Sequence, residues 1–225
     1  MFNKICLLGD FAAGKTSLNR RFVERRFSHQ YLSTVGARIS HKTVVLESNA
    51  QQAICNVPLI IWDLEGRTKF KDISPMYLQG ASGGIIVADA TRRETITRIR
   101  EYIDLFTAIN SQAAVIIALN KVDLISPQTL DDLLPLVSFE SDSRVLATYQ
   151  TSAKTGENVD AVFRALASHL RGRLNNQKQL VPLYGQQNKM IQQHYVSRQL
   201  NLQPASAGAF NFSPSRSESL QCGRS

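Results

Sequence analysis

The residues best suited to chemistry lie in a glycine-containing segment close to the start of the chain. The segment reads Gly9-Asp10-Phe11-Ala12-Ala13-Gly14-Lys15-Thr16-Ser17 and fits the pattern Gly-x-x-x-x-Gly-Lys-Ser/Thr. Glycines let the main chain wrap so that several N–H groups point at phosphate oxygens, and a following helix adds its dipole. Lys15 would reach the β- and γ-phosphates, and the Thr16 hydroxyl would bind Mg²⁺. The pattern predicts a nucleotide-phosphate site; the competing interpretation is a glycine-rich turn with a chance lysine.

Two later segments carry groups suited to a purine base: Asn120-Lys121-Val122-Asp123 and Thr151-Ser152-Ala153-Lys154. The Asp123 carboxylate can accept from guanine N1–H and the 2-amino group together. Adenine has neither donor and would leave a buried carboxylate unpaired, which costs about 1–3 kcal/mol. Asn120 can bond the other edge of the base, and the Ala153 N–H can meet O6. The aliphatic stems of Lys121 and Lys154 can lie against the two faces of the base. These groups predict GTP and GDP as ligands, although each segment alone is also typical of a capped turn.

The elements that must position these residues follow from the hydrophobic pattern. Short apolar runs alternate with helical periodicity, which predicts an α/β fold with a largely parallel sheet. Strands are expected over 4–8, 38–47, 54–62, 84–89, 114–119 and 145–150, and helices over 15–26, 69–79, 93–109, 128–135 and 157–172. The runs 84–88 and 114–119 are apolar throughout, as strands are when helices cover both faces. The alternating segment 38–47 suits an edge strand, turned back antiparallel at 48–50.

The charge divides the 225 residues into two parts. The net charge is +8, but residues 1–172 hold 20 basic and 17 acidic side chains, whereas residues 173–225 hold six basic side chains and one acidic. The excess is therefore in a tail rich in Gln, Asn and Ser, which is expected to be disordered because it can bury little apolar surface. We expect a domain over 1–172. No zinc-ligand spacing or interleaved aromatics accompany the charge, so nucleic acid is not an expected partner.

Three cysteines are too few for a disulfide framework and suit a reducing compartment. A signal peptide is not expected before the first strand, and no apolar stretch approaches the roughly 20 residues of a membrane span. A cytoplasmic location is expected. Cys222 lies four residues from the end, as in prenylated proteins, but Gly223 and Arg224 suit the aliphatic positions poorly. Peripheral membrane association, through a lipid or through the dilute basic tail, stays open.

In this order and spacing, the motifs resemble the Ras superfamily of small GTPases, and its Rab-like branch most closely. Three further segments resemble parts of the family's sequence. Tyr31-Leu32-Ser33-Thr34-Val35-Gly36 resembles the first switch, and Trp62-Asp63 with Gly66 resembles the start of the second switch. Residues 77–83 resemble the stretch that leads into the next strand. The resemblance covers about residues 3–172. It implies the three-layer P-loop NTPase fold, a six-stranded mostly parallel sheet with helices on both faces, GTP, GDP and Mg²⁺ as ligands, and hydrolysis of GTP to GDP and phosphate.

The resemblance also implies roles for single residues. Thr34 would close on Mg²⁺ and the γ-phosphate, Asp63 would hold the ion through water, and the Gly66 N–H would touch the γ-phosphate. Loss of that phosphate would release both switch loops. Phe27 stands where the family places an aromatic against guanine, or else it closes the core. Effectors and regulators would bind the switch regions 28–39 and 64–79. Three side chains stand where Rab proteins contact partners, with core packing as the alternative: Trp62, Tyr77 and Ile39, the last replacing a phenylalanine.

The predicted catalytic residues are Arg67, Gly66 and Lys15, and here the sequence departs from the family. Arg67 replaces the glutamine that orients the attacking water, and arginine has five donors but no acceptor. Phe11 replaces a small residue near the γ-phosphate, and Leu64-Glu65 replaces the usual Thr-Ala. Either hydrolysis is very slow, or Arg67 acts in cis as a cation on the transition state.

Three functions follow from these features. The leading one is a GTP/GDP switch with weak hydrolysis that binds effectors in its GTP form. The second is a constitutively GTP-bound scaffold, which Arg67 and Phe11 favour. The third is another P-loop enzyme, such as an ATPase or a small-molecule kinase, against which Asp123 argues.

Overall fold

The computed structural model describes residues 2–28, 34–48, 53–66 and 74–173. All of them belong to a compact unit that spans Met1–Gln177, while a second unit, Lys178–Ser225, lies outside the described residues. The expected boundary after residue 172 and the expected disorder of the tail therefore stay predictions. Cys222 also lies outside the described residues.

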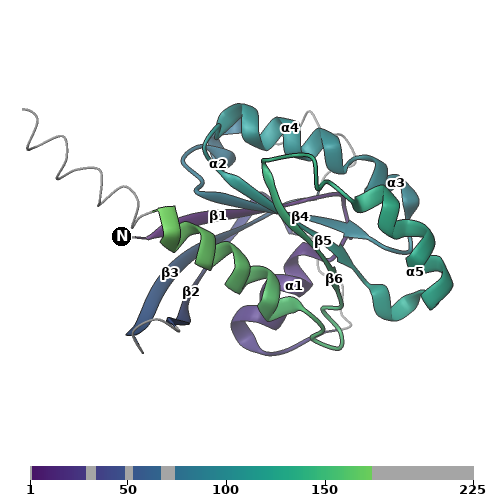
Figure 1. Cartoon of the computed structure of the whole chain (residues 1–225), viewed down its shortest axis with the longest axis horizontal. Coiled ribbons are helices and arrows are strands. Elements are labelled where there is room, and N and C mark those ends of the chain that lie inside the picture. Colours follow the sequence, from purple (N-terminus) through teal and green to yellow (C-terminus); the bar gives the residue numbers. More distant parts are fainter. Residues whose placement is uncertain (1, 29–33, 49–52, 67–73, 174–225) are drawn as a thin grey trace, which may run out of the picture. The chain divides into compact units, whose positions relative to one another are not determined.

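In the described part of the chain, six strands form one sheet (Figure 1): β1 (Asn3–Leu8), β2 (Ala37–Ser48), β3 (Ala53–Leu64), β4 (Gly83–Asp89), β5 (Ala114–Asn120) and β6 (Val145–Thr151). Their order is β2-β3-β1-β4-β5-β6, with β2 antiparallel to β3 and every other pair parallel. The predicted α/β fold with a mostly parallel sheet is confirmed. β2 lies at an edge, as its alternation predicts, and pairs with β3 from Ala37–Leu64 to Ser48–Ala53.

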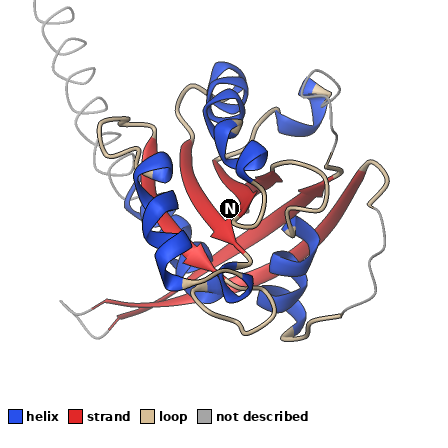
Figure 2. Cartoon of the chain, turned by 90° about the vertical axis from the view of Figure 1, so that its right-hand side faces the viewer, coloured by secondary structure: helices blue, strands red, loops and turns tan. Residues whose placement is uncertain are grey.

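Helices lie on both faces of the sheet and give three layers (Figure 2). On one face, α1 (Lys15–Glu24) and the helical residues 159–173 pack on the odd-numbered side chains of β1 and β4. Phe22 and Phe163 stack there, with 3.9 Å between ring centroids. On the other face, α2 (Pro75–Leu78), α3 (Arg93–Thr97), α4 (Ile99–Ile109) and α5 (Pro127–Leu133) cover the even-numbered side chains. β4 and β5 are buried along their whole length, as expected from their apolar runs.

The expected single helix over 93–109 is wrong, because the chain forms two helices that break at Arg98. The segment contains no glycine or proline to signal the break. Instead, the Thr95 hydroxyl donates to the carbonyl of Arg92, and the Thr97 hydroxyl donates to that of Glu94. Such bonds compete with the helical pattern.

The other helices agree more closely with expectation. α1 stops at Glu24 rather than residue 26, because Arg25 is left-handed with φ 58°. α5 is followed by a 3₁₀ turn, η3 (Leu134–Val137), and the last helix begins at residue 159. Of the expected helix 69–79, the described residues contain only α2, and residues 69–73 lie outside them. No helix in the described ranges is long and apolar enough to cross a membrane.

The five parallel strands end at one edge of the sheet. β1 ends directly before Gly9, β5 ends at Asn120 and β6 ends at Thr151. The phosphate motif and both base motifs therefore follow strands at the edge where open α/β sheets bind their ligands.

Candidate nucleotide-binding site

The phosphate loop (Gly9–Gly14) connects β1 to α1, which confirms the predicted strand–loop–helix context. Gly9 and Gly14 have φ of +135° and +99°. A Cβ at Gly9 would lie 2.1 Å from the Val87 carbonyl oxygen, and one at Gly14 would lie 2.2 Å from Asn120 Nδ2. Only glycine fits both the conformation and the space at these two positions.

Lys15 is the buried cation of this loop. It is 5% exposed, and its Nζ donates to the carbonyls of Gly9 and Asp10, both at 2.8 Å. Burial lowers the pKa of Lys15 to about 8, while the charges of Asp63 and Asp10 act in the opposite direction. A cation held under a loop of main-chain amides suits a polyphosphate.

Oxygen atoms gather beside Lys15. The hydroxyl oxygens of Thr16 and Thr34 lie 2.9 Å apart. Asp63 is fully buried, and neither of its carboxylate oxygens has a hydrogen-bond partner in the described residues. Burial raises the pKa of Asp63, while the positive charge of the Lys15 ammonium acts in the opposite direction. A buried carboxylate without donors is costly, and together with two hydroxyls it fits a hard divalent cation.

Two segments close over the phosphate loop. The Glu65 N–H donates to the Gly36 carbonyl at 2.8 Å, and the Gly36 N–H donates to Glu65 Oε2 at 3.0 Å. Gly66 then approaches the loop so closely that a Cβ on it would lie 2.4 Å from Lys15 Nζ and 2.7 Å from the Asp10 carbonyl oxygen. The next residue, Arg67, lies outside the described residues, so its role stays a prediction.

The base motifs are bonded to the phosphate loop. Asn120 Nδ2 donates to the Ala13 carbonyl at 3.0 Å, and the Ala153 N–H donates to Asn120 Oδ1 at 3.2 Å. The Ser152 hydroxyl donates to Asp123 Oδ1 at 2.6 Å. We expected the Asn120 amide to lie at an edge of the base, whereas both of its ends bind the protein's own main chain. The side chain thus connects its own base motif to the phosphate loop and to the second base motif.

One cavity brings most of the predicted residues together: Phe11, Ala12, Gly14, Lys15, Thr16, Ser17, Phe27, Thr34, Gly66, Asn120, Lys121, Asp123, Ala153 and Lys154. The others do not line it: Gly9, Asp10, Ala13, Asp63 and Ser152. Phe27 both lines the cavity and packs against the core, so its two interpretations are compatible. Sequence reasoning missed four lining residues: Arg20, Ser28, Leu64 and Leu124. Arg20 could have been found, because it stands four residues after Thr16 on one helix face.

Comparison with known proteins agrees with this geometry. Residues 4–123, more than half of the chain, match the family described as Ras of Complex, Roc, domain of DAPkinase. The chain is also 33% identical over 168 residues to GTP-binding protein ypt5 of Schizosaccharomyces pombe, covering 74% of this chain and 77% of that protein. The chain belongs to the Ras superfamily of small GTPases. Its branch is Rab-like. This Rab-like GTPase is a small GTP-binding switch protein with GTP hydrolase activity, and the constitutive scaffold is not favoured.

Proposed function

We propose that this Rab-like GTPase binds GTP and GDP in the cavity beneath Thr34 and Gly66, and exchanges one arrangement of its switch segments for another when the γ-phosphate is lost. The observation that carries the proposal is the convergence on that cavity of five segments far apart in sequence: the phosphate loop, the two switch segments and the two base motifs. Lys15 and the amides of the phosphate loop hold the phosphates. Asp123, Lys121, Ala153 and Lys154 hold the guanine base, with Asn120 bracing them.

Mg²⁺ is the cation we assign to Thr16, Thr34 and Asp63, the last through water. The support is the 2.9 Å pair of hydroxyls and the buried Asp63 carboxylate without a hydrogen-bond donor in the described part of the chain. When bound, Mg²⁺ offsets charge on the phosphate oxygens. Thr34 and Gly66 shield that region from water, and Lys15 supplies its fixed positive charge.

We further propose that hydrolysis is slow without a partner. Arg67 offers no acceptor with which to orient an attacking water. Phe11 lines the cavity and is 39% exposed, so a large ring stands at the wall of the phosphate site. Both features leave the chain able to bind GTP while weakening its turnover.

Effectors and regulators are proposed to bind the switch regions 28–39 and 64–79. The described parts of these regions expose apolar side chains, with Val35, Ile39 and Met76 at 87%, 48% and 69% exposure. Ile39 lies opposite Trp62 in the β2–β3 pair, and the rings of Trp62 and Tyr77 lie 6.3 Å apart. Together they offer an apolar surface of the kind that protein partners cover.

The proposed location is cytoplasmic, and the proposed role is in signal transduction. Peripheral membrane association is the alternative, and it depends on a lipid at Cys222. Mass spectrometry of the protein from its own cells tests a lipid on Cys222. A prenyl mass on the C-terminal peptide would support membrane anchoring, and an unmodified peptide would remove it.

Base selectivity tests the proposed pocket. Wild-type protein is expected to bind GDP at least about 100-fold more tightly than ADP, because Asp123 needs both guanine donors. Asp123→Asn should lose affinity for GDP and gain it for xanthosine diphosphate, whose C2 oxygen accepts from the new amide. Equal affinity for GDP and ADP, or an Asp123→Asn variant with unchanged preference, would contradict this assignment.

A further inference from the structure

The phosphate loop is held from outside the cavity by three side chains of the α3–α4 region, which we call the clasp: Arg92, Arg98 and Tyr102. The Tyr102 hydroxyl donates to Asp10 Oδ1 at 2.7 Å, and Arg98 Nη1 donates to Asp10 Oδ2 at 2.9 Å. Arg92 Nη2 donates to the Phe11 carbonyl at 2.7 Å. Two adjacent loop residues are therefore fixed by one region of the chain that lies 81 to 92 positions later.

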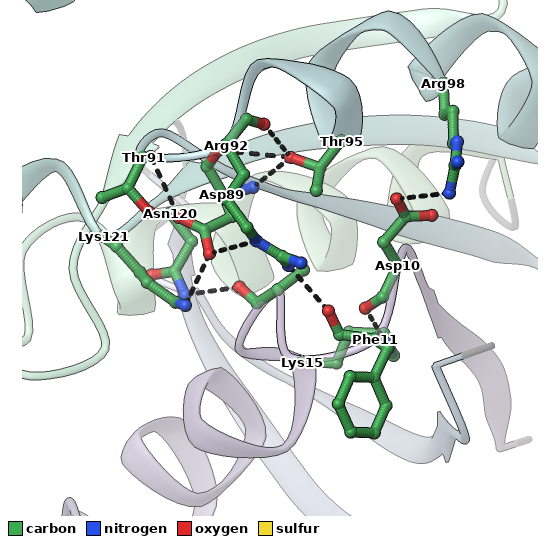
Figure 3. A network of polar contacts seen from close by, with 11 residues as sticks. Asp10, Phe11, Lys15, Asp89, Thr91, Arg92, Thr95, Arg98, Asn120 and Lys121 are labelled. Carbon is green, nitrogen blue, oxygen red and sulfur yellow. Dashed lines mark hydrogen bonds and ion pairs between the residues drawn. The ribbon is translucent and has the colours of Figure 1, made fainter. Parts of the chain in front are cut away.

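The Asp10 carboxylate does not line the cavity. Its side chain is 6% exposed, and Figure 3 shows it directed at Arg98. A buried negative charge in a loop that must accept a polyphosphate weakens anion binding unless it is neutralised. Arg98 provides the opposite charge, and Tyr102, which is 2% exposed, provides a buried donor.

Asp10 and Phe11 also connect the clasp to the groups that bind nucleotide. The main-chain carbonyl of Asp10 accepts from Lys15 Nζ at 2.8 Å, so Asp10 is bonded at its side chain by the clasp and at its carbonyl by the phosphate-binding cation. Arg92 in turn donates through Nε to Asp89 Oδ2 at 3.0 Å, and Lys121 of the base motif binds the same oxygen at 2.6 Å (Figure 3). Asp89 is 1% exposed, so the carboxylate that joins the two cations is buried, while Arg92 and Lys121 are each about one-third exposed.

We propose that Arg98 and Tyr102 are positioning residues for nucleotide binding, which act through Asp10 to fix the phosphate loop and to neutralise the charge inside it. The proposal rests on the function proposed above. Neither residue lines the nucleotide cavity. They set how long the nucleotide is retained, because a loop that moves loses the alignment of its amides and of Lys15.

Release of GDP tests the proposal most simply. Each variant is loaded with fluorescent GDP, and its dissociation rate is measured against excess unlabelled GDP in Mg²⁺. Arg98→Met should release GDP about 10-fold faster, since it removes the cation that pairs with the buried Asp10 carboxylate. Tyr102→Phe keeps the packed ring and should release it about 3-fold faster or more. Arg98→Lys keeps the charge and should lie within about 3-fold of wild type.

The matched control is Arg100→Met. Arg100 lies in α4, two residues after Arg98, and it too pairs with an aspartate, Asp142 at 2.5 Å, which lies away from the phosphate loop. This variant should release GDP at the wild-type rate, even if its thermal midpoint falls.

A second experiment tests whether Arg98 acts by neutralising the charge of Asp10. In Asp10→Asn the side chain is a neutral amide, which needs no cation. Adding Arg98→Met to Asp10→Asn should change the rate by less than about 3-fold, because the two residues are coupled.

Three results would overturn the proposal: GDP release at the wild-type rate in both Arg98→Met and Tyr102→Phe, equal acceleration in Arg100→Met, or failure of Arg98→Lys to restore retention. Failure of the proposed function would look different, because wild-type protein itself would then not retain GDP. Should Arg98→Met not fold, Tyr102→Phe and Arg98→Lys still decide the outcome.

Discussion

The Glu65 carboxylate accepts a hydrogen bond from the main-chain N–H of Gly36, with 3.0 Å between Gly36 N and Glu65 Oε2. The two residues belong to different switch segments, and their main chains are bonded as well, at 2.8 Å. Glu65 stands where the small-GTPase pattern that the sequence resembles has alanine, so the side-chain bond is an added link between the two switches. Thr34 stands two residues before Gly36, and the link therefore favours the closed arrangement in which Thr34 meets Thr16.

Replacing Glu65 should loosen the first switch. In Glu65→Ala, the Gly36 amide loses its carboxylate acceptor, and its hydrogen exchange is expected to accelerate about 10-fold in protein bound to a GTP analogue. Nuclear magnetic resonance of the Gly36 amide measures this rate. Glu65→Gln keeps an acceptor and should lie between wild type and Glu65→Ala. An equal exchange rate in all three proteins would mean that the side-chain bond does not hold the switch.

Gly66→Ala should block closure. A Cβ there would lie 2.4 Å from Lys15 Nζ and 2.7 Å from two main-chain atoms, and the main-chain contacts cannot be relieved by turning a side chain. Trp62 is the single tryptophan and lies four residues before Gly66. Its fluorescence is expected to differ between the GDP and GTP-analogue forms of wild type and to be alike in both forms of Gly66→Ala. A wild-type response in the variant would show that closure does not need glycine.

Lys15 should make stability depend on pH in nucleotide-free protein. Burial lowers its pKa from 10.5 to about 8, so between these pH values the unfolded chain binds more protons at this group than the folded chain. The free energy of unfolding contributed by Lys15 therefore rises with pH across that window. Urea unfolding at pH 7.5, 8.5 and 9.5 should show wild type gaining stability relative to Lys15→Met. Parallel curves for the two proteins would contradict the lowered pKa.

Arg67→Gln should raise the rate of GTP hydrolysis. Glutamine can accept a hydrogen bond from water and orient it, whereas arginine only donates. Single-turnover hydrolysis is expected to accelerate about 10-fold or more. Arg67→Lys keeps a cation without an acceptor and should remain slow. If Arg67 instead stabilises the transition state as a cation, Arg67→Gln would slow the reaction, and this outcome decides between the two roles.

The sheet and most of the cavity lining could be predicted because the features that form them are local in the sequence. Fully apolar runs and glycine-spaced motifs are local features, and each strand fell within a few residues of its expected range. The break at Arg98 was missed because it depends on threonine hydroxyls bonding carbonyls, not on glycine or proline. The partners of Asp10 and Glu65 were missed because only the tertiary fold brings Tyr102 to one and Gly36 to the other.

The most direct test of the central claim follows hydrolysis and conformation in one sample. Purified protein is loaded with GTP and Mg²⁺, GDP is quantified at intervals, and the fluorescence of Trp62 is recorded throughout. We predict GDP formation on the order of 10⁻⁴ to 10⁻³ per second, with the fluorescence changing at the same rate constant because both switches respond to loss of the γ-phosphate. Retention of intact GTP without GDP, GDP formation without a fluorescence change, or failure to load GTP would contradict the account.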